Sequence, residues 1–464
     1  MARHASIALI SVLCFAAGSA HAASKVALKP GDDVPTIVKN SPSGTTFVFA
    51  PGEYRIDTIV AKDNDAFEAD GEVILTGAQL LQPRRSPDGW TASVGTLPEH
   101  IQPDHCLKDH PFCWQLRDVF VDNVLQTPVE SPGELRPGRV FYDEAKASIV
   151  LGADSAGHKV EISTTPVAFT GPAENVRITG LIVEKFATLP QRGAIGNLTD
   201  GAKSWTLDHV EARWNHGTGV AVGSGSHVLN CKLNHNGQKG AQAHGENVLI
   251  EHNEIAYNNY AGYHHSWEAG GTKFVKTVGL VVRDNDVHDN VGAGLWTDID
   301  NIHTTYEGNR VYNNTGDGIK HEISYDAVIR NNLVTNNGAE VQSHWLWGAQ
   351  IMVQNSWNVQ VYGNQVKVPS GANGIVIINQ RRGDGAYGPH IASGNQVHDN
   401  TIVYQSSTGY SGFADDTHTL VDPKNVFENN HYSGASGRHW FCNGAKSFDE
   451  FRMTGFDRHG SWNR

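Results

Sequence analysis

An asparagine that recurs at nearly regular intervals constrains the fold of this chain more than any other feature. Each one lies between two short apolar strand patterns. The intervals are 23, 32, 24, 23, 32 and 36 residues, measured between successive members of the series Asn230, Asn253, Asn285, Asn309, Asn332, Asn364 and Asn400. A base period with occasional insertions is typical of a solenoid with one coil per repeat. Strands this short cannot bury a face alone, so we expect parallel stacking around an apolar interior.

The recurrent asparagine itself suits a structural role. Asparagine tolerates a left-handed backbone, and its side-chain amide can form a hydrogen-bonded ladder between stacked coils. We therefore interpret the series as scaffold and look for the chemistry elsewhere.

Composition and charge narrow the class of protein further. The chain has 464 residues with 49 Gly, and many Gly and Asn beside short apolar runs favour strands and turns over helices. The net charge of −13 argues against nucleic acid or an anionic membrane as a partner.

The first 22 residues have the pattern of a secretory signal peptide. Arg3 and His4 form a polar start, an apolar stretch follows, and Ala20-His21-Ala22 is an A-x-A cleavage site. The apolar stretch is too short for a membrane helix, and no later stretch approaches a membrane span. We therefore expect a secreted or periplasmic protein.

The remaining chain divides into four segments. Residues 23–82 start with a polar linker and continue as the first coils of the solenoid, and residues 83–165 form an inserted antiparallel β module. Irregular long loops on the solenoid are the alternative for 83–165, which its clean strand patterns disfavour. Residues 166–432 carry the repeat. Residues 433–464 lose it and are rich in aromatic side chains, as expected of a segment that caps the open end.

The cysteines indicate one local disulfide. Cys106 and Cys113 lie in a loop-like segment, and in an exported protein this spacing favours a bond between them. Cys231 and Cys442 are far apart in the sequence, which gives no reason to pair them and leaves their state open. No Cys/His spacing resembles a zinc site.

A polar stripe runs along one face of the predicted solenoid. It emerges when the strands after the second Gly of each coil are aligned and alternate positions are assigned outward. The outward set is Gln242, His244; His264, Ser266, Glu268; Trp296, Asp298, Asp300; Lys320, Glu322, Ser324; and Gln350, Met352, Gln354. An ordinary solvated sheet face is the plainest explanation. Two adjoining acidic coils, and long loops at Glu268–Thr277 and Glu340–Trp347, favour a walled cleft instead.

The spacing within the stripe predicts its chemistry. Asp298 and Glu322 occupy the same position on neighbouring coils, which lie about 4.8 Å apart in a parallel stack. Retaining glycosidases need carboxyl groups about 5–5.5 Å apart. Trp296 suits a sugar-stacking platform, and His321 should point inward as a core residue. As substrate contacts we predict Trp296, Asp300, Lys320, His264, Glu268 and Gln350.

These residues predict a retaining glycoside hydrolase that acts on a carbohydrate, and two other functions remain open. A polysaccharide lyase would need a base and a cation to neutralise a uronate, and Ca²⁺ could be that cation. The stripe offers Lys320, whereas Arg381 and Arg382 lie two coils further along, and this favours a neutral sugar. A non-catalytic carbohydrate-binding protein is the third option. For the hydrolase no cofactor is expected.

The combination of signal, opening coils, inserted β module and Asn-rich coils resembles the right-handed parallel β-helix (pectin-lyase-like) superfamily. Within it, Leu295-Trp296-Thr297-Asp298 followed by His321-Glu322-Ile323-Ser324 is similar to β-helix glycoside hydrolases that include a β-xylosidase family. That resemblance implies an all-β, right-handed solenoid, Asp298 as nucleophile and Glu322 as acid/base. Asp300 and Ser324-Tyr325 depart from the family pattern, so the resemblance does not specify the sugar.

Overall fold

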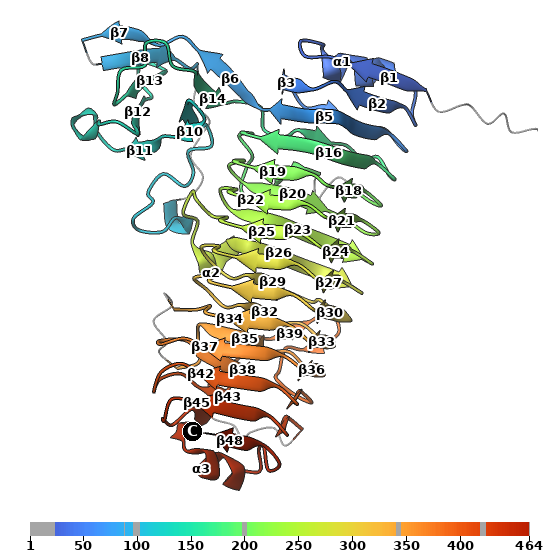
Figure 1. Ribbon diagram of the computed structural model, residues 1–464, viewed down its shortest axis with the longest axis vertical. Helices are drawn as coiled ribbons and strands as arrows, with labels where there is room; N and C mark the ends of the chain where they lie inside the picture. The colour runs from blue at the N-terminus through green and yellow to red at the C-terminus, as the bar shows by residue number, and fades with distance from the viewer. Residues whose placement is uncertain are drawn as a thin grey trace, which may run out of the picture.

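Stacked coils of parallel strands form the body of the molecule. The computed structural model describes residues 24–87, 89–95, 103–196, 202–339, 345–417 and 424–463, so the predicted signal peptide at 1–22 lies outside the described residues. The chain winds from β1 at one end of a long solenoid to α3 at the other (Figure 1). A typical coil holds three strands, such as β29 (Leu295–Asp298), β30 (Thr304–Glu307) and β31 (Arg310–Tyr312). Each pairs in parallel with its counterpart one coil later.

One face of the solenoid is a 13-stranded sheet. Its strands are parallel except for the last pair. In stacking order they are β4 (Ile59–Val60), β15 (Phe169–Thr170), β17 (Gly193–Ile195), β20 (Thr218–Val222), β23 (Lys239–Glu246), β26 (Gly270–Val278), β29, β32 (Ile319–Glu322), β35 (Ala349–Gln354), β38 (Asn373–Asn379), β43 (Ser411–Asp415), β46 (Trp440–Cys442) and β47 (Ala445–Lys446).

The other two faces join into one 24-stranded sheet. The long strands β5 (Ala66–Thr76) and β16 (Arg177–Glu184) connect the faces near the N-terminal end, beside β1 (Lys25–Leu28), β2 (Thr46–Phe49) and β3 (Gly52–Arg55). One stack continues through β18 (Thr206–Asp208), β21 (His227–Leu229), β24 (Leu249–Glu251), β27 (Val281–Arg283), β30, β33 (Ala327–Arg330), β36 (Val359–Tyr362), β41 (Gln396–His398) and β44 (Val426–Glu428). The other runs through β19 (Glu211–Arg213), β22 (Lys232–Asn234), β25 (Glu254–Ala256), β28 (Asp286–His288), β31, β34 (Leu333–Thr335), β37 (Gln365–Val368), β42 (Thr401–Tyr404), β45 (His431–Gly434) and β48 (Ser461–Asn463).

The interior is a continuous column of apolar side chains, repeated coil by coil. Val282, Tyr306 and Ile329, for example, occupy one register on successive coils and are all buried. No single coil could bury such a column, so stability is shared between neighbours. The predicted all-β solenoid is therefore confirmed.

An asparagine ladder runs through the turn between two of the faces, as predicted. The Nδ2 of Asn285 donates to Oδ1 of Asn309 at 3.0 Å, and Asn309 donates in the same way to Asn332 at 3.0 Å. The left-handed residue is not the ladder asparagine but the residue before it, such as Asp284 with φ 54°. The alignment at Asn230 was wrong by one position. Cys231 occupies the ladder position there, and its backbone N–H donates to Asn253 Oδ1 at 2.8 Å, as the backbone N–H of a ladder asparagine does.

An antiparallel module projects from the side of the solenoid near its N-terminal end (Figure 1). It has a four-stranded and a five-stranded sheet and leaves the solenoid between Thr76 and Ser163. The strands are β6 (Ala78–Leu81), β7 (Arg84–Ser86), β8 (Gly89–Ser93), β9 (Val119–Val121), β10 (Val124–Leu125), β11 (Thr127–Val129), β12 (Arg139–Asp143), β13 (Ser148–Leu151) and β14 (Val160–Ser163). β11 and β12 are the exception to the antiparallel pairing.

Both ends of the solenoid carry a short helix. α1 (Val34–Asn40) buries Val34 and Val38 against the first coils, so the segment predicted as a polar linker is in fact β1 and α1. At the other end, α3 (Phe448–Met453) covers the last coil. The expectation that the repeat stops at 433 was wrong, because β46 and β48 extend two of the faces in parallel before α3 and after it. In the described part of the chain, no helix has the length and apolar character needed to cross a membrane.

Candidate active site

The extra residues of the long repeats gather beside the 13-stranded sheet. The first insertion forms α2 (His265–Glu268), which precedes β26. The second precedes β35 and includes Trp345 and Trp347. The third follows β38 and contains the hairpin of β39 (Asp384–Gly385) and β40 (Gly388–Pro389). The three insertions thus supply the walls around one region of the sheet.

One sequence alignment is corrected by this arrangement. Residues after Gly262 form α2 and not a strand, and residues 270–277, predicted as a loop, belong to β26. The insertion lies before the strand of this coil. As a result Lys273, not a residue of α2, takes the outward position beside Trp296, because Phe274 pairs with Thr297.

A cavity of about 500 Å³ opens between these walls. Its lining combines basic, acidic and aromatic side chains: His265, Ser266, Trp267, Lys273, Ala293, Trp296, Asp298, Gly316, Asp317, Lys320, Glu322, Trp347, Gly348, Gln354, Gln380 and Arg382. A volume of this size holds a small oligosaccharide. Polar and aromatic side chains that converge on one cavity are typical of a ligand site.

Asp298 and Glu322 lie at the base of this cavity in direct cross-strand register. Both are the last residues of their strands, and both are almost fully buried, at 7% and 5% exposure. Neighbouring parallel strands lie about 4.8 Å apart, so the two side chains leave the sheet at the spacing that a retaining glycosidase requires. The structure thus brings together the two acids that the sequence analysis singled out.

Glu322 is surrounded by hydrogen-bond donors. Its Oε2 is 2.7 Å from Lys320 Nζ and accepts from Trp296 Nε1 at 3.2 Å, and its Oε1 accepts from Arg382 Nη1 at 2.8 Å. Burial by itself raises the pKa of Glu322, but Lys320 and Arg382 outweigh burial and bring the pKa below its ordinary value. Glu322 is therefore ionised in the substrate-free protein.

Asp298 has fewer partners. Its Oδ2 is 2.8 Å from Lys273 Nζ, while its Oδ1 is buried without a hydrogen-bond partner among the described residues. Lys273 also lies 3.4 Å from Glu268, so its charge is shared. Burial raises the pKa of Asp298, Lys273 only partly opposes this, and the nearby charge of Glu322 raises it further. Of the two acids, Asp298 is the one whose pKa is raised, so it takes up a proton more readily than Glu322.

Trp296 is not the sugar platform that the sequence suggested. The ammonium groups of Lys273 and Lys320 lie 4.0 Å and 4.6 Å from its ring centroids, and the residue is only 3% exposed. The three residues form one column on β26, β29 and β32. Trp296 instead holds two cations against the carboxyl pair by cation–π contact and by its N–H. Trp347, a half-buried residue in the cavity wall, is the aromatic side chain better placed to meet a sugar.

Four of the predicted substrate contacts, beginning with Gln350 and Asp300, have other partners and lie outside the cavity lining. Gln350 is fully buried and ends a second asparagine ladder, accepting from Asn337 Nδ2 at 3.0 Å. Asp300 lies outside the cavity lining, because β29 ends at Asp298 and both Ile299 and Asp300 turn left-handed. Its carboxylate accepts from the backbone N–H of Ala386 at 3.0 Å.

His264 and Glu268 lie at the two ends of α2. His264 is the N-cap and accepts from the Ser266 backbone at 3.3 Å, and it does not line the cavity. Glu268 forms ion pairs with Lys239 at 2.6 Å and with Lys273. It therefore binds Lys273 and does not itself line the cavity. Lys320, like Trp296, is a predicted contact that does line the cavity, next to the acid pair. His321 points into the core, as predicted, with Nε2 bonded to the Tyr325 carbonyl at 2.8 Å.

The inserted module supports the α2 wall through a disulfide-bonded loop. Cys106 and Cys113 form a disulfide, with an S–S distance of 2.02 Å, while Cys231 and Cys442 are free thiols. Cys106 bridges to Tyr263 just before α2, and the ring of His105 stacks on Trp267 at 3.9 Å. The disulfide-bonded loop therefore packs against α2 and supports it.

A buried histidine joins this loop to the solenoid. His216 Nδ1 lies 2.9 Å from Asp118 of the module, and Nε2 lies 2.8 Å from the Cys113 carbonyl. Both partners only accept, so both ring nitrogens carry protons. Burial lowers the pKa of His216, but Asp118 and the carbonyl raise it above its usual value overall.

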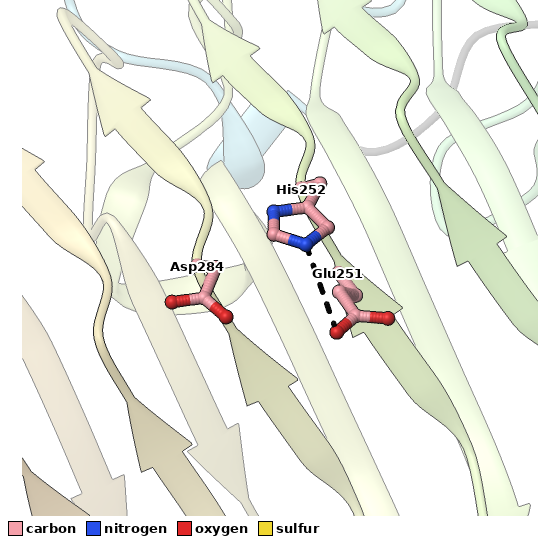
Figure 2. A group of neighbouring side chains, drawn as sticks. All are labelled: Glu251, His252 and Asp284. Atoms are coloured by element: carbon pink, nitrogen blue, oxygen red, sulfur yellow. Dashed lines mark ion pairs between the residues drawn. The ribbon is translucent and has the colours of Figure 1, made fainter.

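One group of side chains in the described residues has the spacing of a metal site. Glu251, His252 and Asp284 have ligand atoms within 4.8 Å of one another (Figure 2). They lie on the outer surface at the ends of β24 and β27, away from the cavity. Arg283 Nε already donates to Glu251 Oε1 at 2.6 Å, and His252 is 57% exposed. Exposed groups of this kind are common without an ion, so no metal is assigned to it.

Comparisons with known proteins agree on the architecture. A family model described as "Right handed beta helix region" matches residues 194–366. A structure titled as a complex of XylC with xylose superposes with a TM-score of 0.67 at 15% identity, covering 87% of this chain and 81% of that chain. The chain is a right-handed parallel β-helix.

Two further solved structures have this β-helix architecture. They are the A-modules of the mannuronan C-5 epimerases AlgE6 and AlgE4 from Azotobacter vinelandii. Their TM-scores are 0.52 and 0.51 at 14% and 12% identity, and each match covers 93% of both chains. A comparison with curated protein sequences gives no match. At these identities the similarity establishes the fold of the β-helix, and function has to be argued from its own residues.

Proposed function

We propose that this β-helix protein is an exported glycoside hydrolase that cleaves its substrate with retention of anomeric configuration. The observation that carries the proposal is the pairing of Asp298 with Glu322 on adjacent strands, where both residues line the same cavity. Their spacing suits a double displacement, in which one carboxylate attacks the anomeric carbon and the other group protonates the departing oxygen. The unlike surroundings of the two acids support unlike roles.

The charge states favour Glu322 as the attacking carboxylate and Asp298 as the proton donor. Lys320 and Arg382 lower the pKa of Glu322, whereas burial raises the pKa of Asp298 and so favours its protonated form. This division is the reverse of the one implied by the resemblance to the β-xylosidase family. In either division the same two residues carry both steps, and after attack the acid becomes the base that activates water.

A sugar as ligand is also supported by the nature of the similar structures. One of them was determined with xylose, and two are named as epimerases of mannuronan. For this protein we propose a polysaccharide or oligosaccharide substrate that enters between α2 and the β39–β40 hairpin.

A lyase acting on a uronate polymer is the second candidate, and one observation favours it. The sequence analysis placed Arg382 away from the stripe, but its guanidinium reaches the acid pair, so three cations surround the site. Against it stands the state of Lys320, the base that such a reaction would use. Burial lowers the pKa of Lys320, but Glu322 and Asp317 raise it more strongly, so the amine stays protonated.

The test is the activity of isosteric variants on aryl glycosides and on uronate polymers. Asp298→Asn and Glu322→Gln should each reduce turnover by about 10³-fold or more while the fold persists. Asp284→Asn, an exposed acid on another face, is the matched control and should keep activity. Product configuration is followed by NMR in the first minutes. Wild-type activity in both variants would refute the hydrolase, and an absorbing unsaturated product lost with chelator would establish the lyase.

A further inference from the structure

Arg382 contacts Glu322 from a loop. It does not lie on a strand of the 13-stranded sheet that carries the acid pair. The loop, residues 380–390, follows β38 and carries the β39–β40 hairpin. Its only described contact with the acid pair is the bond from Arg382 Nη1 to Glu322 Oε1 at 2.8 Å, and the Arg382 side chain is one-third exposed. A long exposed side chain on a loop loses much conformational entropy in one fixed pose, so something else has to position the loop.

Asp300 provides that attachment. Its Oδ1 accepts from the Ala386 N–H at 3.0 Å, from Tyr325 Oη at 3.2 Å and from His390 Nε2 at 3.0 Å. Ala386 and His390 belong to the loop, whereas Asp300 and Tyr325 belong to the turns after β29 and β32. One carboxylate oxygen therefore ties the loop to the two coils that carry the acid pair.

The rest of the loop is built around this contact. Tyr325 Oη also lies 2.9 Å from the Gly388 carbonyl, so its one proton is shared between that carbonyl and Asp300. Asn355 binds both ends of the loop, accepting from Gln380 N–H at 3.0 Å and donating to the His390 carbonyl at 2.9 Å. At Gly385 an added Cβ would lie 2.1 Å from Asp300 Oδ1. The backbone can approach the carboxylate this closely only at a glycine.

We propose that Asp300, with Tyr325 and His390, is a positioning residue that holds loop 380–390 in place so that Arg382 reaches Glu322. The inference rests on the proposed hydrolase for its meaning. Asp298 and Asp300 then have different roles, since Asp298 lines the cavity and Asp300, outside the lining, binds the loop.

The sign of a pH effect separates this role from plain electrostatics. Loss of the Asp300 charge alone would lower the pKa of Glu322, because a negative charge has been removed from its surroundings. Release of Arg382 would raise that pKa, because a cation that favours the carboxylate has left. The positioning role thus predicts that the acidic limb of the activity profile moves to higher pH, and a direct charge effect predicts the opposite.

The experiment compares Asp300→Asn, Arg382→Gln and the double variant with Asp384→Asn, which removes an exposed charge from the same loop. For Asp300→Asn, kcat/KM should fall roughly threefold to tenfold on the acidic limb, with a smaller change near the optimum. The double variant should match Arg382→Gln alone, because both changes remove one interaction. The proposal would be overturned if the acidic limb of Asp300→Asn did not move or moved to lower pH. It would also be overturned if the effects of Asp300→Asn and Arg382→Gln added up in the double variant.

A second readout does not depend on catalysis. Hydrogen exchange of the loop amides, including that of Ala386, should quicken in Asp300→Asn and stay near wild type in Asp384→Asn. Tyr325→Phe removes a hydroxyl without changing charge and serves if Asp300→Asn does not fold. Faster exchange in an enzyme with no glycosidase activity would support the attachment and reject the proposed function, whereas unchanged exchange would reject the attachment.

Discussion

The guanidinium of Arg382 lies 2.8 Å from the carboxylate of Glu322, although 60 residues separate them in the chain. With Lys320 at 2.7 Å on the other oxygen, this contact makes Glu322 the ionised member of the acid pair. Asp298 has no such pair of cations. The difference between the two acids therefore lies in their neighbours, since their positions on the sheet are equivalent.

The roles of the two acids can be separated with azide. When the nucleophile is replaced by alanine, azide attacks the sugar directly and gives a glycosyl azide of inverted configuration. When the acid is replaced, azide attacks the covalent intermediate and gives a retained product. We expect inversion for Glu322→Ala and retention for Asp298→Ala, measured by NMR of the azide products. The opposite pattern would assign Asp298 as nucleophile and leave the hydrolase in place.

Removal of Lys273 should extend activity to higher pH. Lys273 lowers the pKa of Asp298, so Lys273→Met lets that pKa rise further and the proton donor stays protonated longer. The alkaline limb of the kcat/KM profile should move to higher pH. Lys276→Met, an exposed residue of the same strand, is the control. A limb that moves to lower pH would show that Asp298 is not the donor.

Loss of the disulfide should weaken substrate binding as well as stability. Cross-linking so short a loop contributes about 2–3 kcal/mol in the chain-entropy model, so the Cys106→Ser/Cys113→Ser variant should unfold at lower denaturant concentration. Because the loop supports α2 beside the cavity, KM should rise more than kcat falls. Cys442→Ser is the control. An unchanged KM in the folded double variant would show that α2 stands without this support.

His216 should stabilise the fold mainly at acidic to neutral pH. Its pKa is raised in the folded protein, so its stabilising contribution is complete below the unfolded pKa and is lost as pH rises through the folded pKa. The difference in unfolding free energy between wild type and His216→Gln should therefore be larger at pH 5.5 than at pH 8.5. Denaturant titrations at both values measure it. A constant difference would mean that His216 is neutral in the folded state.

Gln350 should matter for stability and not for binding. Its amide accepts from Asn337 and donates to the Asn337 carbonyl at 2.9 Å, so Gln350→Ala leaves buried groups without partners. We expect a loss of about 2–4 kcal/mol in unfolding free energy with KM unchanged. Gln360→Ala, on an exposed position of β36, is the control. A raised KM at full stability would restore Gln350 as a substrate contact.

Sequence periodicity predicted those features that depend on neighbouring coils alone. The register of Asp298 with Glu322 was predictable, because the two strands follow the same glycine at the same distance and the repeat between them is uninterrupted. Lys273 was missed because an insertion precedes its strand, so the glycine used for alignment, Gly262, is followed by α2 and not by the strand. The doubled glycine at 270 and 271 was the available signal.

Features that depend on the path of a loop could not be predicted in this way. Alternation placed Asp300 beside Asp298, but the strand ends at Asp298 because Ile299 and Asp300 itself are both left-handed. Arg382 and Trp347 reach the cavity through insertions whose direction no repeat encodes. Trp296 was assigned correctly to the outward face, yet the lysines above and below it decide what its ring contacts.

The ladders of asparagine have a consequence for how such a protein can diversify. Each coil is held by hydrogen bonds to the coil before and the coil after, and the inserted segments before β26 and β35 begin only after a ladder residue, Asn258 or Asn337. A connection there can gain or lose residues while every ladder keeps its register. The residues around the cavity can therefore change by exchange of three inserted segments, those before β26, before β35 and after β38, while the stacked coils stay the same.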